Sequence, residues 1–599
     1  MKRQFRMRVS AIVLAAVILA ALVPAWFVGA EEAAWDGKAA DGFASGTGAE
    51  DDPFLVKTAG QLKYFANLVN GGDDFAGKFV KLESDLVLND VTHFDKWKKA
   101  PPKNNWVSIG TDKAPFSGNF DGGNHVLTGF YLNSLNQYQG LFGFMRNATV
   151  KNIRLENCYV RGSRATGSVV GISLATDGKD SLIENCFADG IVDSLGEQVF
   201  AIDGSGTLYG EACANNDGML AGVVGCNEAR DGGNAVVRGC YNKCSVSHNN
   251  GVAVAGVVGF SHGFNGGFAT VADCRNEGEL DIIIGWSGDA AGIVGRSYAN
   301  DDGVSVVECC LNFGKVRING GASPAGAGIV GRNVAGENGT VLVDRCCNMG
   351  IIASGRMAGG VVGINLIEGV GGARAMVSNS FNSGWVRGRT DSIGGVAGLN
   401  YVYDGKDSSS LLVNCYSIGR VDGETSGGVT GDCFAERGGK SEVRDCYYLA
   451  GSAKAAIGTR KTEGELIAVD VAEFTEEEMQ KQASFEGFDF DAVWSIGEIE
   501  GYAYPVLQWM AEADFASVED PEETSEESSE AVSEEESAAV SEASDSSEAG
   551  SGASEASEAS GASGSGEENG SLTWLWVLLG VVVVGGGAAA AVGISKKKK

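Results

Sequence analysis

A quartet of the form Gly-x-x-Gly recurs nine times along the chain, and this repeat restricts the folds that the chain can adopt. The copies begin at residues 140, 168, 222, 256, 292, 328, 360, 395 and 428, with serine in place of the first glycine at Ser168. Their starts lie 28, 54, 34, 36, 36, 32, 35 and 33 residues apart, and the long interval indicates an insertion around residues 195 to 218. Regular periods of this length are typical of solenoids and propellers, in which each repeat is one structural unit.

A cysteine follows each quartet at a nearly constant distance. It lies eighteen or twenty residues after the start of the quartet, with serine once in its place: Cys158, Cys186, Cys240, Cys274, Cys310, Cys346, Ser380, Cys415 and Cys446. Three positions earlier every copy has an aliphatic residue: Leu155, Ile183, Val237, Val271, Val307, Val343, Val377, Leu412 and Val443. Between quartet and cysteine lie turn pairs such as Asp177-Gly178 and Asn338-Gly339, which reach positive φ at low cost.

Each unit is therefore expected to contain three short β-branched segments separated by glycine-rich corners. One unit cannot bury its apolar side chains alone, whereas coiled units stack equivalent residues about 4.8 Å apart. The sequence predicts an all-β, right-handed parallel β-helix of about nine repeat rungs, because crossovers between parallel strands are almost always right-handed. In this interpretation the quartet is scaffolding, a strand with two tight corners, and not a phosphate-binding loop.

These repeats resemble the GLUG repeats of bacterial surface proteins. The resemblance rests on the quartets, on the asparagine or serine that follows them, and on Asn-Cys-Tyr segments such as Asn157-Cys158-Tyr159 and Asn414-Cys415-Tyr416. Asparagine or serine follows the quartet at Ser173, Asn227, Asn333, Asn365 and Asn400. The resemblance covers about residues 140 to 450 and extends to flanking segments on both sides. It implies surface display and adhesion, although such repeats also accompany some proteases.

The two ends of the chain indicate export and a membrane anchor. Basic residues and an apolar run precede Val28-Gly29-Ala30, which fits a signal peptide over residues 1–30. Leu572 to Ile594 carries no charge and is long enough to span a bilayer. We expect a transmembrane helix over 571–595 and a cytoplasmic lysine tail over 596–599, hence a single-pass type I protein whose bulk is extracellular.

An acidic, Ser/Glu/Ala-rich segment over residues 516–570 separates the repeats from the expected span. It carries 17 acidic residues from Glu519 to Glu568 and no basic residue, so we expect a disordered stalk. The whole chain has a formal net charge of −32. This charge argues against nucleic acid and anionic lipid surfaces as partners.

Caps are expected at both ends of the β-helix, because its terminal strands would expose unpaired backbone and apolar side chains. Residues 31–139 are assigned to an N-terminal cap, with a capping box of Thr58 and Gln61 and strand-like pieces around Phe79, Val107 and Phe120. The repeats occupy 140–450. Residues 451–515 form the expected C-terminal cap, with Thr475 and Glu478 at a short helix and a closing strand formed by Trp494 and by residues 504–507.

Neither metal nor cofactor is expected. Eight of the fourteen cysteines occupy one inward position, which favours buried reduced thiols over a ladder of disulfides. Off this ladder lie Cys213, Cys226, Cys244, Cys309, Cys347 and Cys433, for which both states stay open. The four histidines, His93, His125, His248 and His262, show no zinc-ligand spacing. Acidic turns at 177–180, 300–303 and 404–407 lack the oxygen spacing of calcium loops, and turn chemistry explains them.

The sequence favours a binding protein over an enzyme. His-Glu-x-x-His and Gly-x-Ser-x-Gly motifs are absent. Glu156 with Glu184, and Glu308 with Asp344, are expected in one register on adjacent rungs, where a polysaccharide lyase or hydrolase would need two carboxylates. The simpler hypothesis is that these four acids are solvated.

We therefore expect no catalytic residues and a monomeric ectodomain that presents the β-helix to host or cell-envelope glycans or proteins. Aromatic residues suited to glycan stacking are Trp286, Trp385, Tyr401 and Tyr403. A polysaccharide-active enzyme and a purely structural envelope component are the alternatives.

Overall fold

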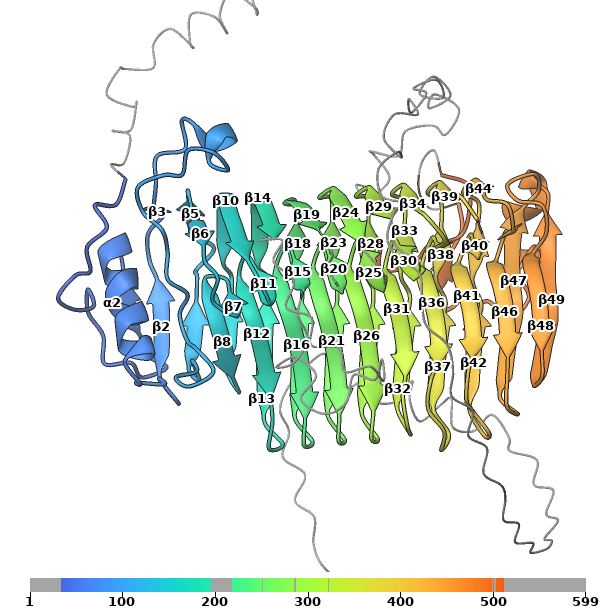
Figure 1. The fold of residues 1–599 in the computed structure, drawn as a ribbon, viewed down its shortest axis with the longest axis horizontal. Helices are drawn as coiled ribbons and strands as arrows, with labels where there is room; N and C mark the ends of the chain where they lie inside the picture. Colours follow the sequence, from blue (N-terminus) through green and yellow to red (C-terminus); the bar gives the residue numbers. More distant parts are fainter. Residues whose placement is uncertain are drawn as a thin grey trace, which may run out of the picture. The chain divides into compact units, whose positions relative to one another are not determined.

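The computed structural model describes residues 34–194, 218–249, 252–284, 287–320, 323–390, 392–497, 499 and 502–510. Their strands form a parallel β-solenoid of about nine turns, built from three sheets that run along one axis (Figure 1). All pairings between named strands are parallel except for the pair β50–β51. The prediction of an all-β parallel coil with about nine repeats is confirmed.

Two of the sheets, B and C, contribute one strand each to most turns. Sheet C contains β7 Tyr138–Gln139, β11 Ala165–Gly167, β15 Met219–Ala221, β20 Ala253–Ala255, β25 Ser287–Ala291, β30 Ser323–Ala327, β35 Met357–Gly359, β40 Ile393–Gly394 and β45 Ser426–Gly427. Sheet B contains β8 Phe142–Arg146, β12 Val170–Ala175, β16 Val224–Arg230, β21 Val258–Phe264, β26 Val294–Asn300, β31 Val330–Ala335, β36 Val362–Ile367, β41 Ala397–Val402, β46 Thr430–Ala435 and β48 Ile457–Thr462.

Sheet A is folded into three rows of strands. The first row is β1 Phe54–Val56, β2 Phe79–Leu82, β4 Asn119–Asp121, β9 Thr149–Lys151, β13 Asp180–Glu184, β17 Asn234–Arg238, β22 Phe268–Ala272, β27 Val304–Glu308, β32 Thr340–Asp344, β37 Arg374–Ser378, β42 Ser409–Val413, β47 Lys440–Leu449 and β49 Glu465–Phe474. The second row is β14 Phe187–Ser194, β18 Tyr241–Asn242, β23 Arg275–Asn276, β28 Leu311–Asn312, β33 Cys347–Asn348, β38 Phe381–Asn382 and β43 Tyr416–Ser417. The third row is β3 Leu86–Val87, β5 Val126–Thr128, β6 Tyr131–Asn133, β10 Arg154–Gly162, β19 Ser245–Asn249, β24 Leu280–Ile284, β29 Val316–Gly320, β34 Ile352–Ser354, β39 Val386–Gly388 and β44 Val421–Asp422.

In successive turns of the solenoid, one residue with a left-handed backbone conformation lies between the first-row segment and the second-row segment. It stands directly before the cysteine position, and φ at these residues is between 44° and 63°. The residues are Asn185, Gly239, Asp273, Cys309, Arg345, Asn379, Asn414 and Asp445. Asparagine, aspartate and glycine prefer this conformation, which explains their frequency at this position.

The Gly-x-x-Gly quartet forms one corner and the start of a strand, not a strand with two corners. Gly360 lies in the bend between β35 and β36, and Gly363 lies inside β36. Neither glycine has positive φ. A Cβ on Gly360 would lie 2.2 Å from the carbonyl oxygen of Gly395, and one on Gly363 would lie 2.5 Å from that of Gly331. Glycine is therefore needed here because neighbouring turns approach closely, and not because both positions are tight corners, as we had expected.

Seven of the eight predicted cysteines form the inward ladder. Each of these buried thiols donates to the carbonyl oxygen two residues earlier, at 3.1 to 3.5 Å, and all seven are free. Cys158 does not belong to the ladder, because β10 contains a register shift between Leu155 and Cys158. Val150 and not Leu155 pairs with Ile183 in the first turn.

A ladder of buried asparagines, which the sequence analysis did not identify, runs beside the cysteines. Asn242, Asn276, Asn312 and Asn348 each donate from Nδ2 to Oδ1 of the next asparagine, at 2.7 or 2.8 Å, and the last member, Asn382, donates to Ser417 Oγ at 3.2 Å. The asparagines that follow the quartets are also buried, and Asn333, Asn365 and Asn400 form a second ladder at 2.9 Å. Both ladders give buried amides partners inside the solenoid, with Oδ1 of Asn333 as an exception.

The N-terminal end is closed as predicted by α2 Ala59–Asn70. Its Leu62, Phe65, Ala66 and Val69 are buried. Thr58 caps the helix, but the Gln61 side chain accepts from Lys57 and not from Thr58, so only half of the expected capping box forms. The predicted strand at Val107 is wrong, because Val107 is exposed and lies outside any strand.

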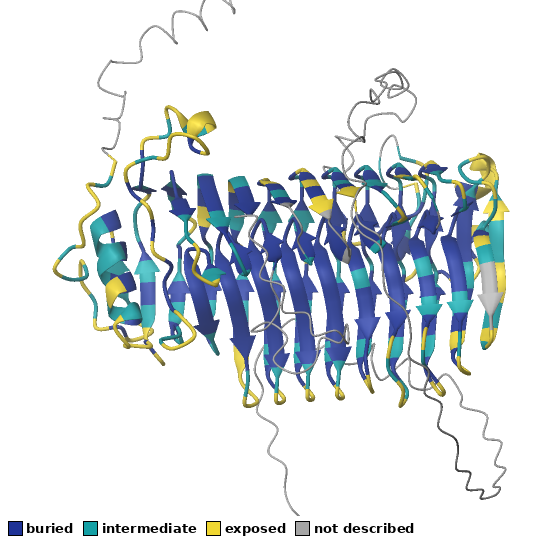
Figure 2. Cartoon of the chain, in the orientation of Figure 1, coloured by how far each residue is buried: buried dark blue, intermediate teal, exposed yellow. Residues whose placement is uncertain are grey.

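The C-terminal region does not close the other end of the solenoid in the way that we had predicted. The capping box at α4 Glu476–Met479 and the pairing of β50 Trp494–Ser495 with β51 Val506–Leu507 are confirmed. These elements and η3 Gln482–Ser484 pack against the side of sheet A. The last strand, β49, is mostly exposed or half-buried, in contrast to the buried strands of the central turns (Figure 2).

No helix within the described ranges is long and apolar enough to cross a membrane. The predicted signal peptide, the acidic segment and the predicted span over Leu572 to Ile594 lie outside these ranges.

Candidate functional site

One row of outward-facing residues runs along sheet A through successive turns. Its members pair in register from turn to turn, and all except the first stand directly after the cysteine position, whereas Arg154 follows Ile153. We call this row the axial stripe; it consists of Arg154, Phe187, Tyr241, Arg275, Leu311, Cys347, Phe381, Tyr416 and Tyr447. Sequence analysis had named only Tyr416, in an Asn-Cys-Tyr segment, and Cys347, as an off-ladder cysteine.

The C-terminal half of the axial stripe, from Leu311 to Tyr447, is covered by residues 475–510. Phe381 and Tyr416 stack with ring centroids 5.0 Å apart, and Trp494 lies 5.8 Å from Tyr416. The Tyr416 hydroxyl donates to the carbonyl oxygen of Pro505, and the Tyr447 hydroxyl donates to that of Glu486 at 3.1 Å. This half of the stripe is buried and forms a satellite core.

No described segment packs over the N-terminal half of the axial stripe, from Arg154 to Arg275. The Arg154 guanidinium lies 4.3 Å from the Phe187 ring centroid, and Phe187 packs edge-on against Tyr241 at 5.3 Å. The Arg275 guanidinium lies 4.4 Å from the ring of Phe313, one turn further along. Arg154 is exposed, and the other four side chains are half-buried. We call this half the open stripe.

A network of charges surrounds Tyr241 in the open stripe. Glu277 pairs with Lys243 at 3.1 Å and with Arg275 at 2.7 Å. Burial opposes ionisation of Glu277, but its hydrogen bonds with Tyr241, Lys243 and Arg275 outweigh this effect and lower its pKa. Burial also raises the pKa of Tyr241, so this phenol is neutral at physiological pH. The open stripe therefore offers aromatic faces, one phenol and several cations on adjacent turns.

The aromatic residues that sequence analysis had selected do not form one site. Trp385 donates from Nε1 to Asp422 at 2.8 Å and lies beside the guanidinium groups of Arg387 and Arg420. Tyr401 and Tyr403 meet edge-on at 6.1 Å at the end of β41, on another side of the solenoid. Trp286 lies outside the described residues.

Glu308 and Asp344 are register partners, as predicted, but they are not simply solvated. Both bind Arg345, with N–O distances of 2.5 and 2.8 Å. Asp344 also accepts hydrogen bonds from Ser378 and Asn379. Burial raises the pKa of Glu308, although the nearby Arg345 acts in the opposite direction.

Glu156 and Glu184 are not register partners, which corrects the second predicted pair. Glu156 pairs with Thr128, and Glu184 pairs with Lys151, because of the irregularity in β10. Glu156 forms an ion pair with Arg154, and Glu184 forms one with Arg238.

The described residues contain no group of three or more histidine, cysteine or acidic side chains arranged to hold a metal ion. Of the off-ladder cysteines, Cys244 and Cys309 are free thiols. Cys226 is disulfide-bonded.

Comparisons with known proteins add little to this geometry. No family model matches the chain, so the resemblance to GLUG repeats rests on the motifs alone. A relative in Evansella cellulosilytica, provisionally named a Gly-rich membrane protein, is 31% identical over 120 residues; the match covers 20% of this chain and 12% of that protein. A crystal structure from Bacteroides ovatus, provisionally described as an immunoglobulin A1 protease, covers 78% of this chain and 96% of its own at 15% identity and a TM-score of 0.29.

Proposed function

We propose that this protein is a non-enzymatic, membrane-anchored surface protein that binds glycans along the open stripe. The observation that carries the proposal is the contrast within the axial stripe. Its C-terminal half packs against the protein's own residues 475–510, whereas Phe187, Tyr241 and Arg275 continue the same row without a described segment over them. Surface display is supported by the expected signal peptide and span, and by the partial match to a protein named as a membrane protein.

The chemistry of the open stripe suits a sugar polymer. Aromatic rings offer apolar faces against which the C–H face of a sugar packs, while arginine and lysine donate hydrogen bonds to its oxygens. The stripe positions of adjacent turns lie about 4.8 Å apart, a spacing close to the length of one sugar unit. An extended chain along the solenoid axis would therefore meet an arginine, two aromatic rings and a second arginine in succession.

A glycan array on residues 31–515 tests the proposal. The variants Phe187→Ala and Tyr241→Ala should each lose at least about tenfold in affinity, since a stacked aromatic contributes roughly 1–3 kcal/mol. Tyr403→Ala is the matched control, because it removes an exposed tyrosine from a different side of the solenoid. Equal losses from Tyr241→Ala and Tyr403→Ala, or no loss from either stripe variant, would contradict the proposal.

The second candidate is a glycan-cleaving enzyme that uses Glu308 and Asp344. A half-buried acid with raised pKa beside a hydrogen-bonded carboxylate is an arrangement that glycosidases use. Against it, Arg345 occupies the space between the two carboxylates and binds both. Reducing-sugar release from acidic and neutral polysaccharides, lost in Glu308→Gln and Asp344→Asn, would establish this activity and overturn the non-enzymatic proposal.

A further inference from the structure

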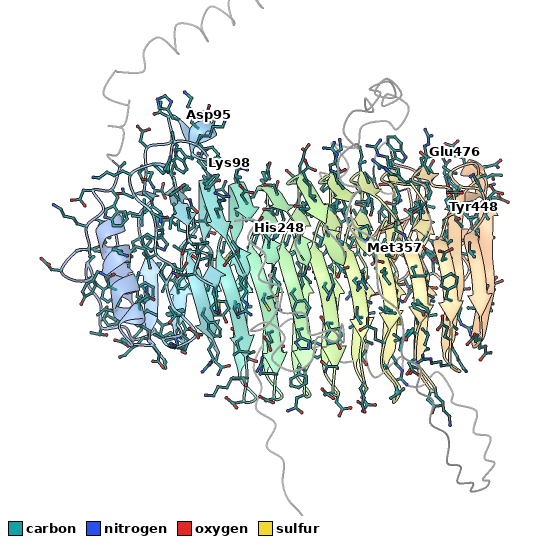
Figure 3. All side chains as sticks on the ribbon, viewed as in Figure 1. Asp95, Lys98, His248, Met357, Tyr448 and Glu476 are labelled. Carbon is teal, nitrogen blue, oxygen red and sulfur yellow. The ribbon has the colours of Figure 1, made fainter. Side chains whose placement is uncertain are left out.

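A cluster of lysines projects from the N-terminal part of the solenoid of this acidic protein. Residues 89–104 leave sheet A and carry four exposed lysines, Lys96, Lys98, Lys99 and Lys103. We call this segment the lysine loop. Figure 3 shows Asp95 at the tip of this loop, above the strands, and Lys98 lower down, nearer the strand ends. The loop contains two acidic residues, Asp90 and Asp95, so four lysines minus two acids give it a net charge of +2, in a chain of net charge −32.

The lysine loop is held in place at its centre and at its base. Trp97 is buried and meets Tyr131 edge-on at 5.7 Å, and Tyr131 stacks on Tyr159 at 5.5 Å. At the base, Asn89 donates to the carbonyl oxygen of Asn104 and accepts from its backbone N–H, both at 2.9 Å. The lysines are thus presented from a fixed backbone, which reduces the entropy lost on binding.

The lysine loop contacts β10 and β14, the two strands that also carry the first two residues of the open stripe. Lys98 forms an ion pair with Asp193 at the end of β14, 2.8 Å away, while Phe187 begins that strand. Tyr159, which supports the loop, lies in β10, and Arg154 begins β10. The lysine loop therefore lies beside the open stripe, about 20 Å along the strands from Phe187, and a polymer that crosses the stripe in the direction of β14 would reach it.

We propose that the ligand is an anionic glycan, carrying sulfate or carboxylate groups, and that the lysine loop selects it. This inference rests on the proposed function and specifies its ligand class. Lys96 and Lys99 have no ion pair with any described residue, so their charges are available for a ligand. The acidic charge of the rest of the chain disfavours polyanions in general, so attraction is confined to this surface.

The test compares two probes that differ only in charge, dextran sulfate and uncharged dextran, on the full-length chain purified in detergent. The wild type should bind dextran sulfate at least about tenfold more tightly at low salt, and this preference should shrink as salt screens the lysines. The triple variant Lys96→Gln, Lys99→Gln, Lys103→Gln should lose most of that preference. A matched triple variant, Lys57→Gln, Lys440→Gln, Lys454→Gln, removes the same charge from exposed lysines elsewhere and should retain it.

The outcomes separate this inference from the proposed function. Equal binding of the two dextrans, no binding of dextran sulfate at low salt, or equal losses in the two triple variants would overturn the lysine loop as a selector. If Tyr241→Ala weakens the binding of both dextrans but dextran sulfate still binds more tightly than dextran, the open stripe is supported as the glycan surface. Unchanged binding in Tyr241→Ala would instead overturn the proposed function itself.

Discussion

The two halves of the axial stripe share one backbone geometry but differ in what lies over them. From Leu311 to Tyr447 the stripe is apolar, and Phe485, Trp494 and Leu507 of the C-terminal segment pack on it. From Arg154 to Arg275 the same register positions carry two aromatic rings, Phe187 and Tyr241, between two guanidinium groups. The solenoid supplies the same position in each half, and the side chain at that position determines whether the chain buries it or leaves it accessible.

This difference shows why a repeat does not by itself reveal a binding surface. The repeat constrains inward positions, since every turn must fill the same core and satisfy the same buried amides. Outward positions are free to differ between turns. A functional surface on this protein is therefore a local departure from the repeat. At equivalent outward positions, the open half has Tyr241 and Arg275, whereas the covered half has Leu311 and Phe381.

The largest effect is expected when a charge enters the core that both halves share. Val343→Asp in the covered half and Val237→Asp in the open half each place an unpaired carboxylate at a fully buried position. We expect both variants to lose the cooperative unfolding transition, as measured by circular dichroism during thermal unfolding. Val236→Asp, at the neighbouring half-buried outward position, is the control and should still fold. A folded Val343→Asp variant would contradict the inward ladder.

The next effect distinguishes the halves directly. Tyr416→Ala removes a buried ring that stacks on Phe381 and contacts Trp494, so its free energy of unfolding should fall by about 3–5 kcal/mol. Tyr241→Ala removes a half-buried ring and should cost less than about 1 kcal/mol. Urea unfolding of both variants measures the difference. Equal costs would mean that the open stripe is a second packing surface and not a binding surface.

Sequence periodicity predicted the coil, the turn pairs and the inward aliphatic row, because these features repeat with a fixed spacing. It placed Cys158 wrongly, because the irregularity in β10 shifts the register within one turn without changing the pattern of residue types. It missed the asparagine ladder, although Cys-x-Asn at Cys240, Cys274 and Cys310 was a visible signal.

The candidate site was less predictable than the fold for a physical reason. Sequence analysis selected Trp385, Tyr401 and Tyr403 as exposed aromatics, but it could not show which side of a turn each one occupies. Nor could it show that residues 475–510 lie along sheet A, because this contact joins positions far apart in the chain, such as Trp509 and Arg345. Which residues lie side by side in the open stripe depends on the register between turns, and residue type alone does not reveal it.

A smaller effect should be the same in both halves, since it concerns the interior. Asn348→Ala and Asn276→Ala each remove a buried amide that both donates and accepts in the asparagine ladder. Each should lower the free energy of unfolding by about 1–3 kcal/mol, because the neighbouring amides lose a partner. Chemical unfolding of the two variants provides the measurement. A much larger cost in one half would show that the ladder also depends on what covers the outside.

The smallest effect concerns two glutamates whose pKa values shift in opposite directions. In the open stripe, hydrogen bonds to Lys243 and Arg275 lower the pKa of Glu277 despite its partial burial. Beside the covered half, burial raises the pKa of Glu308 despite Arg345. A lowered pKa means that the folded state binds fewer protons than the unfolded state, so this stabilisation is present above the unfolded pKa and is lost as pH falls through the folded value. A raised pKa has the opposite sign, and stability decreases as pH rises through the interval between the two values.

The variants Glu277→Gln and Glu308→Gln should therefore change the pH dependence of stability in opposite senses. Relative to wild type, Glu277→Gln should be less stable at neutral pH, and the difference should vanish on acidification below the ordinary glutamate range. Glu308→Gln should be equally or slightly more stable at neutral pH, since the amide still accepts from Arg345 and Asp344 still neutralises that guanidinium. Both differences should stay below about 1 kcal/mol, because the two side chains keep some contact with solvent. Urea unfolding of the three proteins at pH 3.5 to 7 measures these differences, and parallel pH profiles for the two variants would contradict the opposite environments assigned to the two glutamates.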